Sequence, residues 1–584
     1  MGSAGSIDEK VAQRPMARKR GRHPRSGADN ERGAVRKKWQ GRIRVALVYP
    51  QPYAVGMSNL GYQNVYRLFN AVDDVVCERV FPVPEAHPPG AVRSLESGAL
   101  LTDFDIVAFS VSFENDYLNL LRVLEQAGLP LQSKQRGTPH PLVIAGGVAC
   151  QLNPEPIADF IDCFLIGEAE VLLPAFLAQF RAHADRRQLL LDLARRTPGV
   201  YVPCLYETTY HADGTLKAMV PAAGVPARVK RVFLKDLAEA ETVTAVVTKD
   251  TTFGRRYLVE VGRGCPHGCR FCSAGYIYRP PRFRPLSALE AAVARGSALA
   301  GGVGLVGAAV SDLPGIAELC RYARDHQIPL SFSSLRADAL TPALIEDLGK
   351  SGSKTATLAP DAGSERMRRV INKGLSEKQI LDAVAALVAA GIANFKLYFM
   401  LGLPGEQLDD VDAIAVLSRK IKHTFLKASR MRGQMGRITL SLNCFVPKPF
   451  TPFQWAPMDT VATLKGKIRR VKRALAKVPN VRVHADIPRW AYVQALLARA
   501  DRRVSGMLQL ALQNRGNWAQ TFKETPLNPD FYALRQRRAD ERFPWEVIDH
   551  GTRRDFLRRE FERAGLALPS KSCPMTACDA CGVC

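Results

Sequence analysis

Short runs of consecutive apolar residues alternate with longer stretches in which apolar residues recur at helical spacing. In the first third of the chain the short runs are 45–48, 106–111, 142–145 and 163–166, and the helical stretches are 60–69, 118–125 and 157–162. A switch between these two periods predicts a parallel sheet whose strands are joined by crossover helices. Gly146 and Gly147 follow the third strand run, where an open α/β sheet presents its ligand crevice.

A second series of the same kind begins near residue 257. Its strand runs are 257–261, 304–309, 330–334, 355–359, 396–401 and 439–445. Six strands with intervening helices predict a barrel or partial barrel of parallel strands. Between the two series, a charged helix near 186–196 and a strand or two at 200–210 indicate a linker region.

Length and composition set the domain count and the class of protein. A chain of 584 residues exceeds a single core and predicts three or four domains. With 47% hydrophobic and 23% charged residues, the composition is typical of a soluble globular protein. The predicted parts are a disordered basic arm at 1–42, a Rossmann-like α/β domain at 43–180, a linker region at 181–250, a barrel at 251–475 and a helical region with a cysteine cluster at 476–584.

The apolar segments and the net charge bear on location and partners. No apolar stretch reaches the ~20 residues that span a bilayer, and the first residues have no apolar signal core, so we expect a cytoplasmic protein without a membrane partner. The net charge is +25, and the basic residues are dense before residue 45. Such an excess favours an anionic partner such as RNA, or it only keeps a large protein in solution.

Three of the thirteen cysteines lie within eight residues directly after the first strand of the second series. Cys265, Cys269 and Cys272 have the spacing C-x3-C-x2-C. Thiolates suit iron–sulfur clusters or zinc, but a structural zinc site normally takes four protein ligands. Three thiolates leave one iron of a four-iron cluster open, and S-adenosylmethionine can chelate an open iron.

This motif, with the aromatic Phe271 before its last cysteine, resembles the signature of the radical SAM superfamily. The resemblance implies a [4Fe-4S] cluster that reductively cleaves S-adenosylmethionine, and an electron donor such as flavodoxin or ferredoxin. It assigns cofactor contacts to Phe271, Gly307, Ala308, Ala309, Ser333, Arg336 and Asp361. The 403–406 turn resembles the branch shared with methylthiotransferases, in which a Glu usually stands at the position of Asp361.

An α/β domain before such a barrel resembles the B12-binding-domain radical SAM proteins of bacteria. That resemblance implies a cobalamin between sheet and barrel, with contacts at Gly146 and Gly147. The loop at 50–59 has no Asp-x-His-x-x-Gly motif and therefore no histidine ligand for cobalt. Either cobalamin binds without a protein ligand below the cobalt, or the domain serves as a scaffold.

A second cysteine cluster lies at the end of the sequence. Cys573, Cys578, Cys581 and Cys584 provide four soft ligands with the spacing C-x4-C-x2-C-x2-C. Both zinc and a second iron–sulfur cluster fit this spacing. The site would relay electrons, anchor a substrate, or fasten the chain end.

The leading hypothesis is a radical SAM enzyme that modifies a large substrate by cobalamin-dependent methyl transfer. One alternative is a methylthiotransferase or another sulfur-inserting radical SAM enzyme that acts on RNA or protein. A non-catalytic, basic RNA-binding protein is the alternative from another class.

Overall fold

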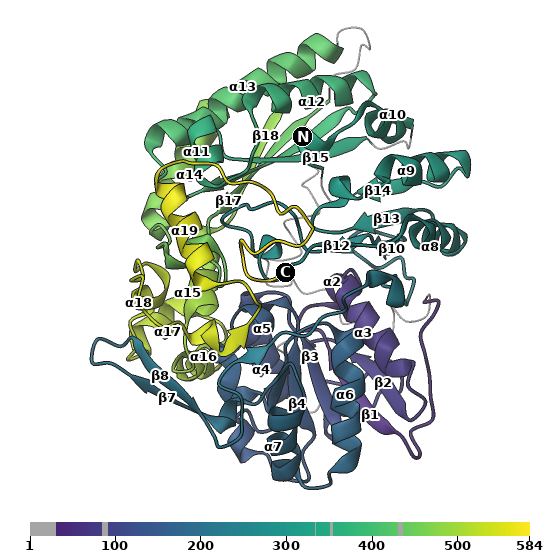
Figure 1. Ribbon diagram of the computed structural model, residues 1–584, viewed down its shortest axis with the longest axis vertical. Coiled ribbons are helices and arrows are strands. Elements are labelled where there is room, and N and C mark those ends of the chain that lie inside the picture. Colours follow the sequence, from purple (N-terminus) through teal and green to yellow (C-terminus); the bar gives the residue numbers. More distant parts are fainter. Residues whose placement is uncertain (1–30, 85–91, 333–334, 351–353, 430–435) are drawn as a thin grey trace.

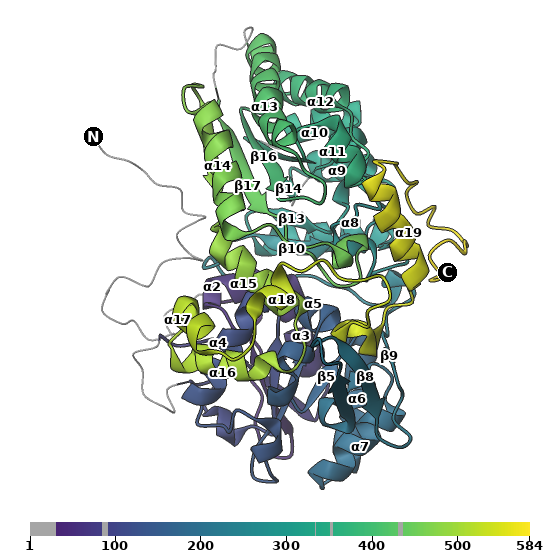
Figure 2. The same ribbon diagram turned by 90° about the vertical axis from the view of Figure 1, so that its left-hand side faces the viewer.

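The computed structural model describes residues 31–84, 92–332, 335–350, 354–429 and 436–584. Two α/β units lie one above the other along the long axis of the molecule (Figures 1 and 2). The N-terminal unit is the lower one in Figure 1, and the barrel unit lies above it. The first thirty residues of the predicted basic arm lie outside the described residues.

The N-terminal unit is a six-stranded sheet in the order β2-β1-β3-β4-β5-β6, parallel except for β6. Its strands are β1 (Ile43–Val48), β2 (Val75–Val80), β3 (Ile106–Ser110), β4 (Leu142–Gly146), β5 (Cys163–Leu165) and β6 (Val200–Tyr201). Helices α3 (Leu60–Asn70), α4 (Tyr117–Gln126) and α6 (Ala169–Ala182) connect or follow its strands. The four strands expected from the apolar runs are confirmed as β1, β3, β4 and β5. Strands β2 and β6 are the two edge strands of the sheet.

Seven parallel strands form the barrel unit as two sheets. They are β10 (Tyr257–Glu260), β13 (Val303–Val306), β14 (Leu330–Phe332), β15 (Thr355–Asp361), β16 (Asn394–Leu401), β17 (Ile438–Cys444) and β18 (Val481–Ala485). A parallel bridge between Leu335 and Leu358 joins the two sheets, so the barrel is partial. The six expected strands are confirmed. The predicted end at residue 475 differs from the structure, because β18 pairs with β17 and extends this unit to Ala485.

Two of the other predicted boundaries also differ from the structure. Residues 31–42 are packed on the first sheet rather than free, because Glu31 forms an ion pair of 2.6 Å with the buried Arg79 and the Trp39 indole donates to Glu78. The first part of the predicted linker region at 181–250 belongs to the N-terminal unit. Its helix α7 (Arg186–Arg196) and strand β6 lie in this unit.

The C-terminal region touches both units. Helices α15 (Pro488–Arg499) and α16 (Val504–Gln513) pack against the N-terminal unit, whereas α19 (Arg554–Gly565) packs against α11 (Glu365–Val370) of the barrel. After α19 the chain returns to the level where the two units meet (Figure 1). Among the described residues, no helix combines the length and the apolar character needed to cross a bilayer.

Candidate functional site

The three clustered cysteines lie on the loop between β10 and β12 (Arg282–Phe283). Strand β11 (Gly262–Arg263) pairs with β12 and closes the base of this loop. Gly264 has a φ of +83°, and a Cβ there would lie 2.6 Å from the Tyr278 carbonyl oxygen. The loop is therefore folded too tightly at its base for any other residue.

The three thiols lie in an environment that is partly closed to water. Burial, together with the charge of the neighbouring loop thiolates, raises the pKa of Cys265 to about 12 and that of Cys272 to about 11. Among the described residues, no three His, Cys, Asp or Glu side chains are gathered closely enough for a single metal ion. Soft thiolates are the ligands that iron–sulfur clusters take.

Two cations border the cysteine loop. Lys373 Nζ lies 2.6 Å from Asp361 Oδ2, and both side chains are almost fully buried. The Arg336 guanidinium donates to the Lys373 carbonyl oxygen at 3.0 Å. The charge of Lys373 acts to lower the pKa of the Cys272 thiol, and a Cys269 thiolate contributes to the raised pKa of Arg336. Arg336 also has an acidic partner, because it pairs with Asp338 at 2.8 Å, so each of the two cations beside the loop is matched by one carboxylate.

Lys373 is a residue of this site that the sequence pattern did not reveal. Its ion pair with Asp361 closes a turn in which Asp361 has a φ of +61°. Nothing in the local sequence indicates that this lysine points inward. The only signal was its place after Asn372, whose side chain donates to the Gly268 carbonyl oxygen in the cysteine loop at 3.1 Å.

The loop histidine has a fixed partner. His267 Nε2 lies 2.7 Å from Asp312 Oδ1, and Asp312 stands in the loop after β13. This pair joins the cysteine loop to the neighbouring strand end. Asp312 Oδ2 has no hydrogen-bond partner among the described residues.

A cavity of about 440 Å³ lies between the carboxyl edge of the first sheet and the barrel unit. Gly146 and Gly147 line it from the sheet, and Gly307 and Ala308 line it from the end of β13. The structure thus brings four of the residues predicted from sequence to one space. The carboxyl ends of parallel strands form this edge, as expected for the ligand crevice of such sheets.

The remaining predicted residues are placed differently. Ala309 is buried at the start of the next turn and does not line this cavity. Phe271 packs on the apolar cluster that includes Ala362 and Met367. Ser333 lies outside the described residues.

The wall of the cavity carries an ion cluster that crosses between the two units. Arg263 of the barrel unit lies 2.7 Å from Glu168 and 2.6 Å from Glu170, and Arg282 also pairs with Glu168. Burial alone would raise the pKa of each carboxyl, but the arginines outweigh burial and lower both values. Both carboxylates are therefore ionised at neutral pH.

One residue of the cavity wall has a buried acceptor without a partner. Gln151 lines the cavity, and its side-chain nitrogen donates to the Gly167 carbonyl oxygen at 3.2 Å. Its Oε1 atom is buried and has no hydrogen-bond partner among the described residues. A buried amide oxygen in this state costs about 1–3 kcal/mol.

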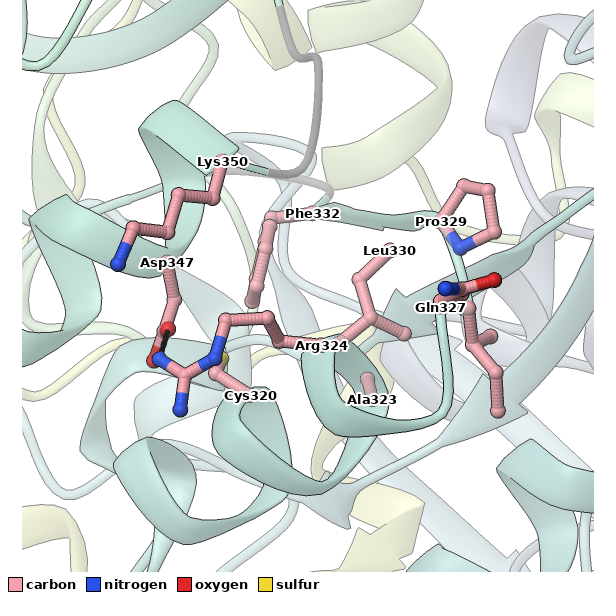
Figure 3. A pocket seen from close by; sticks show the side chains of 10 residues that line it. Cys320, Ala323, Arg324, Gln327, Pro329, Leu330, Phe332, Asp347 and Lys350 are labelled. Carbon is pink, nitrogen blue, oxygen red and sulfur yellow. Dashed lines mark hydrogen bonds and ion pairs between the residues drawn. The ribbon is translucent and has the colours of Figure 1, made fainter.

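A separate hollow of about 300 Å³ lies on the outer side of the barrel unit, between α9 (Ile316–Asp325), β14 and α10 (Pro342–Lys350) (Figure 3). Arg324 pairs with Asp347 at 2.6 Å, and the thiol of Cys320 lies beside them. None of the predicted site residues lines this hollow. Cys320 is therefore a suitable control residue for substitutions at the cysteine loop.

Comparisons with known proteins agree with this architecture. Residues 61–203 match the family "Radical SAM proteins, N-terminal", and residues 259–417 match the "Radical SAM superfamily". A protein of Methanocaldococcus jannaschii, "Uncharacterized protein MJ0966", is 30% identical over 470 residues, which are 80% of this chain and 90% of the relative. The chain belongs to the radical SAM superfamily. Members of this superfamily use a [4Fe-4S] cluster and S-adenosylmethionine.

Two solved structures are similar at lower identity. The radical S-adenosylmethionine methyltransferase TsrM from Kitasatospora setae, with cobalamin and a [4Fe-4S] cluster bound, is 13% identical with a TM-score of 0.45, over 90% of this chain and 100% of that one. The cobalamin-dependent S-adenosylmethionine radical enzyme OxsB is 14% identical with a TM-score of 0.42, over 67% of this chain and 55% of that one.

Proposed function

We propose that this radical SAM enzyme holds its cluster on Cys265, Cys269 and Cys272 and transfers a methyl group from cobalamin to a large substrate. The observation that supports the proposal is the single cavity that connects Gly146 and Gly147 with Gly307 and Ala308. A cofactor against the sheet and one against the barrel would meet in this space. The bound groups would supply a 5'-deoxyadenosyl radical and a transferable methyl group.

The residues of the chain would bind and orient these groups. Lys373 and Arg336 lie beside the cysteine loop, where their side chains would donate hydrogen bonds to S-adenosylmethionine while Asp361 and Asp338 balance their charges. The pair of His267 and Asp312 would keep the cysteine loop in register with the end of β13. The ion cluster around Arg263 would hold the two walls of the cavity at a fixed separation.

The residues of the cavity fit a corrin in two respects. Glycine, alanine and serine supply much of the sheet side, so a flat ring would approach the backbone closely. A rotation of the Gln151 side chain would bring its unpartnered Oε1 into the cavity, where it would accept from an amide, and the rim of a corrin carries amides. No histidine is among the residues that line the cavity, so cobalt would bind without a protein ligand from this wall.

A large anionic substrate suits the charge of the chain. The net charge of +25 favours RNA, or a protein with an acidic surface, over a neutral metabolite. Sulfur insertion into RNA or protein would use the same cysteine loop but would need no corrin. Corrin binding therefore separates the two reactions.

The first test is the release of 5'-deoxyadenosine by anaerobically reconstituted protein with dithionite. Cys269→Ala removes one proposed ligand, and we expect it to lower the release at least about a hundredfold, because a cluster with two protein ligands is not held. Cys320→Ala, in the hollow of Figure 3, should keep the parental rate. Equal release by the parent and Cys269→Ala would contradict the assignment of the loop.

The second test is the affinity for hydroxocobalamin, measured from the visible spectrum after gel filtration. Gly61 lines the cavity, and a Cβ there would meet only Asn59 Oδ1, at 3.3 Å. Gly61→Trp should fill part of the space and weaken corrin binding by tenfold or more, about 1.4 kcal/mol. Gly466→Trp, on a helix outside the cavity, should bind as the parent does. A parent that binds no corrin would exclude cobalamin-dependent methyl transfer.

A further inference from the structure

One short part of the chain holds much of its positive charge. Residues 413–485 contain sixteen Lys and Arg residues and a single acidic residue, Asp459, in a chain whose net charge is +25. This part includes the second half of α13 (Leu408–Ser429), strands β17 and β18, and helix α14 (Val461–Leu475) between them. Helix α14 packs on α13 and β18, and β17 pairs with β18. The positive charge is therefore gathered on neighbouring elements of the barrel unit.

Helix α14 has an apolar side against the sheet and a basic side toward solvent. Leu464 and Val471 are among the residues that it buries. Four exposed cations follow one another on its outer side at spacings of three and four residues, and we call them the basic stripe: Lys465, Arg469, Lys472 and Arg473. In Figure 2, α14 runs along the outer side of the barrel unit, and α15 lies at its lower end.

The other two cations of α14 have acidic partners. Lys467 is buried and pairs with Glu406 and Asp459, each at 2.7 Å. Arg470 pairs with Asp412 of α13 at 2.5 Å. Within the part of the chain that the structure describes, no side chain of the basic stripe forms an ion pair or a hydrogen bond. The stripe is therefore the share of the helix charge that the protein itself does not neutralise.

The stability of α14 does not account for the basic stripe. Like charges three or four residues apart on a helix repel one another. The helix dipole favours cations only in the last turn, which includes no more than the second half of the stripe. Helix α19 shows the usual arrangement of a solvated helix, because its exposed Arg558 and Arg559 each pair with an acid four residues away. An unpaired row of cations indicates a partner that brings negative charge.

The surface of α14 favours a polyanion over a protein or a membrane. All residues of this helix are described, and none of its large apolar side chains is exposed. A protein interface has an apolar core, and a helix on a membrane surface needs an exposed apolar face. Interfaces with nucleic acids are instead polar and strongly positive. The basic stripe has the composition of a nucleic-acid interface.

The helix that carries the stripe is connected to the edge of the first sheet. Helix α14 packs on α15, whose Gln494 donates to Glu114 Oε2 at 2.9 Å. Lys448, on the loop after β17, pairs with the same carboxylate at 2.6 Å. Glu114 follows Ser112, which lines the cavity between the two units. A long ligand held along the stripe would therefore extend toward the level of this cavity.

We propose that the basic stripe binds the phosphate backbone of an RNA chain, and that RNA is the large substrate of the enzyme. The inference rests on the proposed function, because the bound RNA carries the group that is modified. Phosphate contacts position a chain without reading its sequence. Only a base outside a duplex can enter an enclosed site. RNA presents such unpaired bases in its loops and ends, whereas duplex DNA shares only the phosphodiester backbone.

The affinity for RNA tests the basic stripe directly. The probe is a fluorescein-labelled oligouridine, whose anisotropy is followed as the full chain is added. The stripe variant replaces four cations: Lys465→Gln, Arg469→Gln, Lys472→Gln and Arg473→Gln. It should bind about tenfold more weakly or worse at low salt. The slope of log affinity against log salt should fall by about 3, since each phosphate contact with a single strand contributes about 0.7.

The matched control removes the same charge from other parts of the surface. It replaces four exposed cations that form no ion pair with any described residue: Arg187→Gln, Lys217→Gln, Lys235→Gln and Arg321→Gln. This variant should bind within about twofold of the parent. Equal losses in the two variants would mean that only the net charge matters, and a stripe variant with the parental affinity would also overturn the proposal.

A competitor distinguishes RNA from an acidic protein. Poly-glutamate with the same number of charges should displace the labelled RNA at least about tenfold less well than unlabelled oligouridine does, because the stripe offers no apolar contacts to a polypeptide. Equal displacement by the two competitors would make an acidic protein the partner and would overturn the assignment to RNA.

A measurement on the parent alone covers the case in which the stripe variant does not fold. Exposed lysines are acetylated with and without the oligouridine, and the modified positions are identified by mass spectrometry. Bound RNA should protect Lys465 and Lys472 several-fold and should leave Lys217 and Lys235 as reactive as before. Protection of all four lysines alike, or of none, would contradict a site on α14.

Labelled methyl groups test RNA as the substrate. With S-adenosylmethionine labelled in its methyl group, the parent should label total RNA and not denatured DNA. The stripe variant should raise the KM for RNA about tenfold and change kcat less, since the stripe lies away from the reacting atoms. Release of 5'-deoxyadenosine without label in RNA would overturn RNA as the substrate. A parent that binds RNA on the stripe but releases no 5'-deoxyadenosine would count against the proposed function instead.

Discussion

At the scale of the residue, one buried histidine connects the C-terminal region to the wall of the cavity. His550 Nε2 donates to the Gln151 carbonyl oxygen at 2.8 Å, and its ring meets Phe450 edge to face. Nδ1 has no partner among the described residues. Burial, helped by the nearby Arg231, lowers the pKa of His550 to about 3. The ring is therefore neutral in the folded protein at any physiological pH.

This lowered pKa predicts a loss of stability in acid. The unfolded histidine takes up its proton near pH 6.5, whereas the folded one does not until about pH 3. The contribution of His550 is thus complete above pH 6.5 and is lost as the pH falls below it, at about 1.4 kcal/mol per pH unit. Urea unfolding gives the unfolding free energy of the parent at pH 7 and at pH 5.5. The difference between these two values should be about 1 kcal/mol smaller in His550→Gln.

The matched control for this prediction is His326→Gln, because His326 is exposed at the end of α9. It should leave the pH dependence of the unfolding free energy unchanged. A His550→Gln protein with the parental pH dependence would mean that other groups cause the acid effect.

Residue-scale features of the site were only partly predictable. The spacing of Cys265, Cys269 and Cys272 was readable because all three lie in one short loop. The pair of Lys373 and Asp361 was not, because a charged side chain has the same sequence signal whether it points inward or outward. Gly307 and Ala308 were selected through the resemblance, and they line the same cavity as Gly146 from the opposite side.

At the scale of the element, a buried arginine of the cysteine loop fastens helix α19 to that loop. Arg270→Met would leave Glu560, which is about nine-tenths buried, with only the more distant Arg563 at 3.8 Å as a cationic partner, and would leave several carbonyl oxygens without a donor. We expect a loss of about 3 kcal/mol in the unfolding free energy, since breaking a buried pair strands the other charge. Chemical unfolding measures it.

Limited proteolysis would locate the effect of Arg270→Met, which should make the tail, residues 566–584, cleavable before the barrel. Arg369→Met is the control, because Arg369 makes only an exposed ion pair of 4.0 Å with Glu365. Its substitution should cost less than about 0.5 kcal/mol. Equal effects of the two substitutions would show that the tail is held by other contacts.

Strand prediction succeeded where no charged residue breaks the apolar run and failed where charged residues interrupt it. All residues of β2 are buried, yet its sequence includes Glu78 and Arg79, which interrupt the apolar run. The short strand β6 lies within the stretch expected at 200–210. Strand β18 was not predicted, and it carries Arg482 and His484. These charged side chains have partners or reach the surface, and a periodicity argument has no access to such partners.

At the scale of the whole molecule, the two α/β units were predictable but their mutual placement was not. Each unit has its own alternation of strand and helix, which local sequence records. The contacts that join the units, such as Arg263 with Glu168 and Glu170, connect residues more than ninety positions apart. No periodic pattern encodes such contacts, so the cavity between the units emerged only from the structure.

The fastening of the tail also has a consequence for biosynthesis. Arg270 finds its carboxylate partner 290 positions further along the chain. At ~5–20 residues per second, a ribosome needs roughly 15–60 s to add that length. During this interval the three loop cysteines have left the ribosome while the helix and tail that cover them do not yet exist. A cell that supplies iron and sulfide during translation would therefore deliver them to a loop that the tail does not yet border.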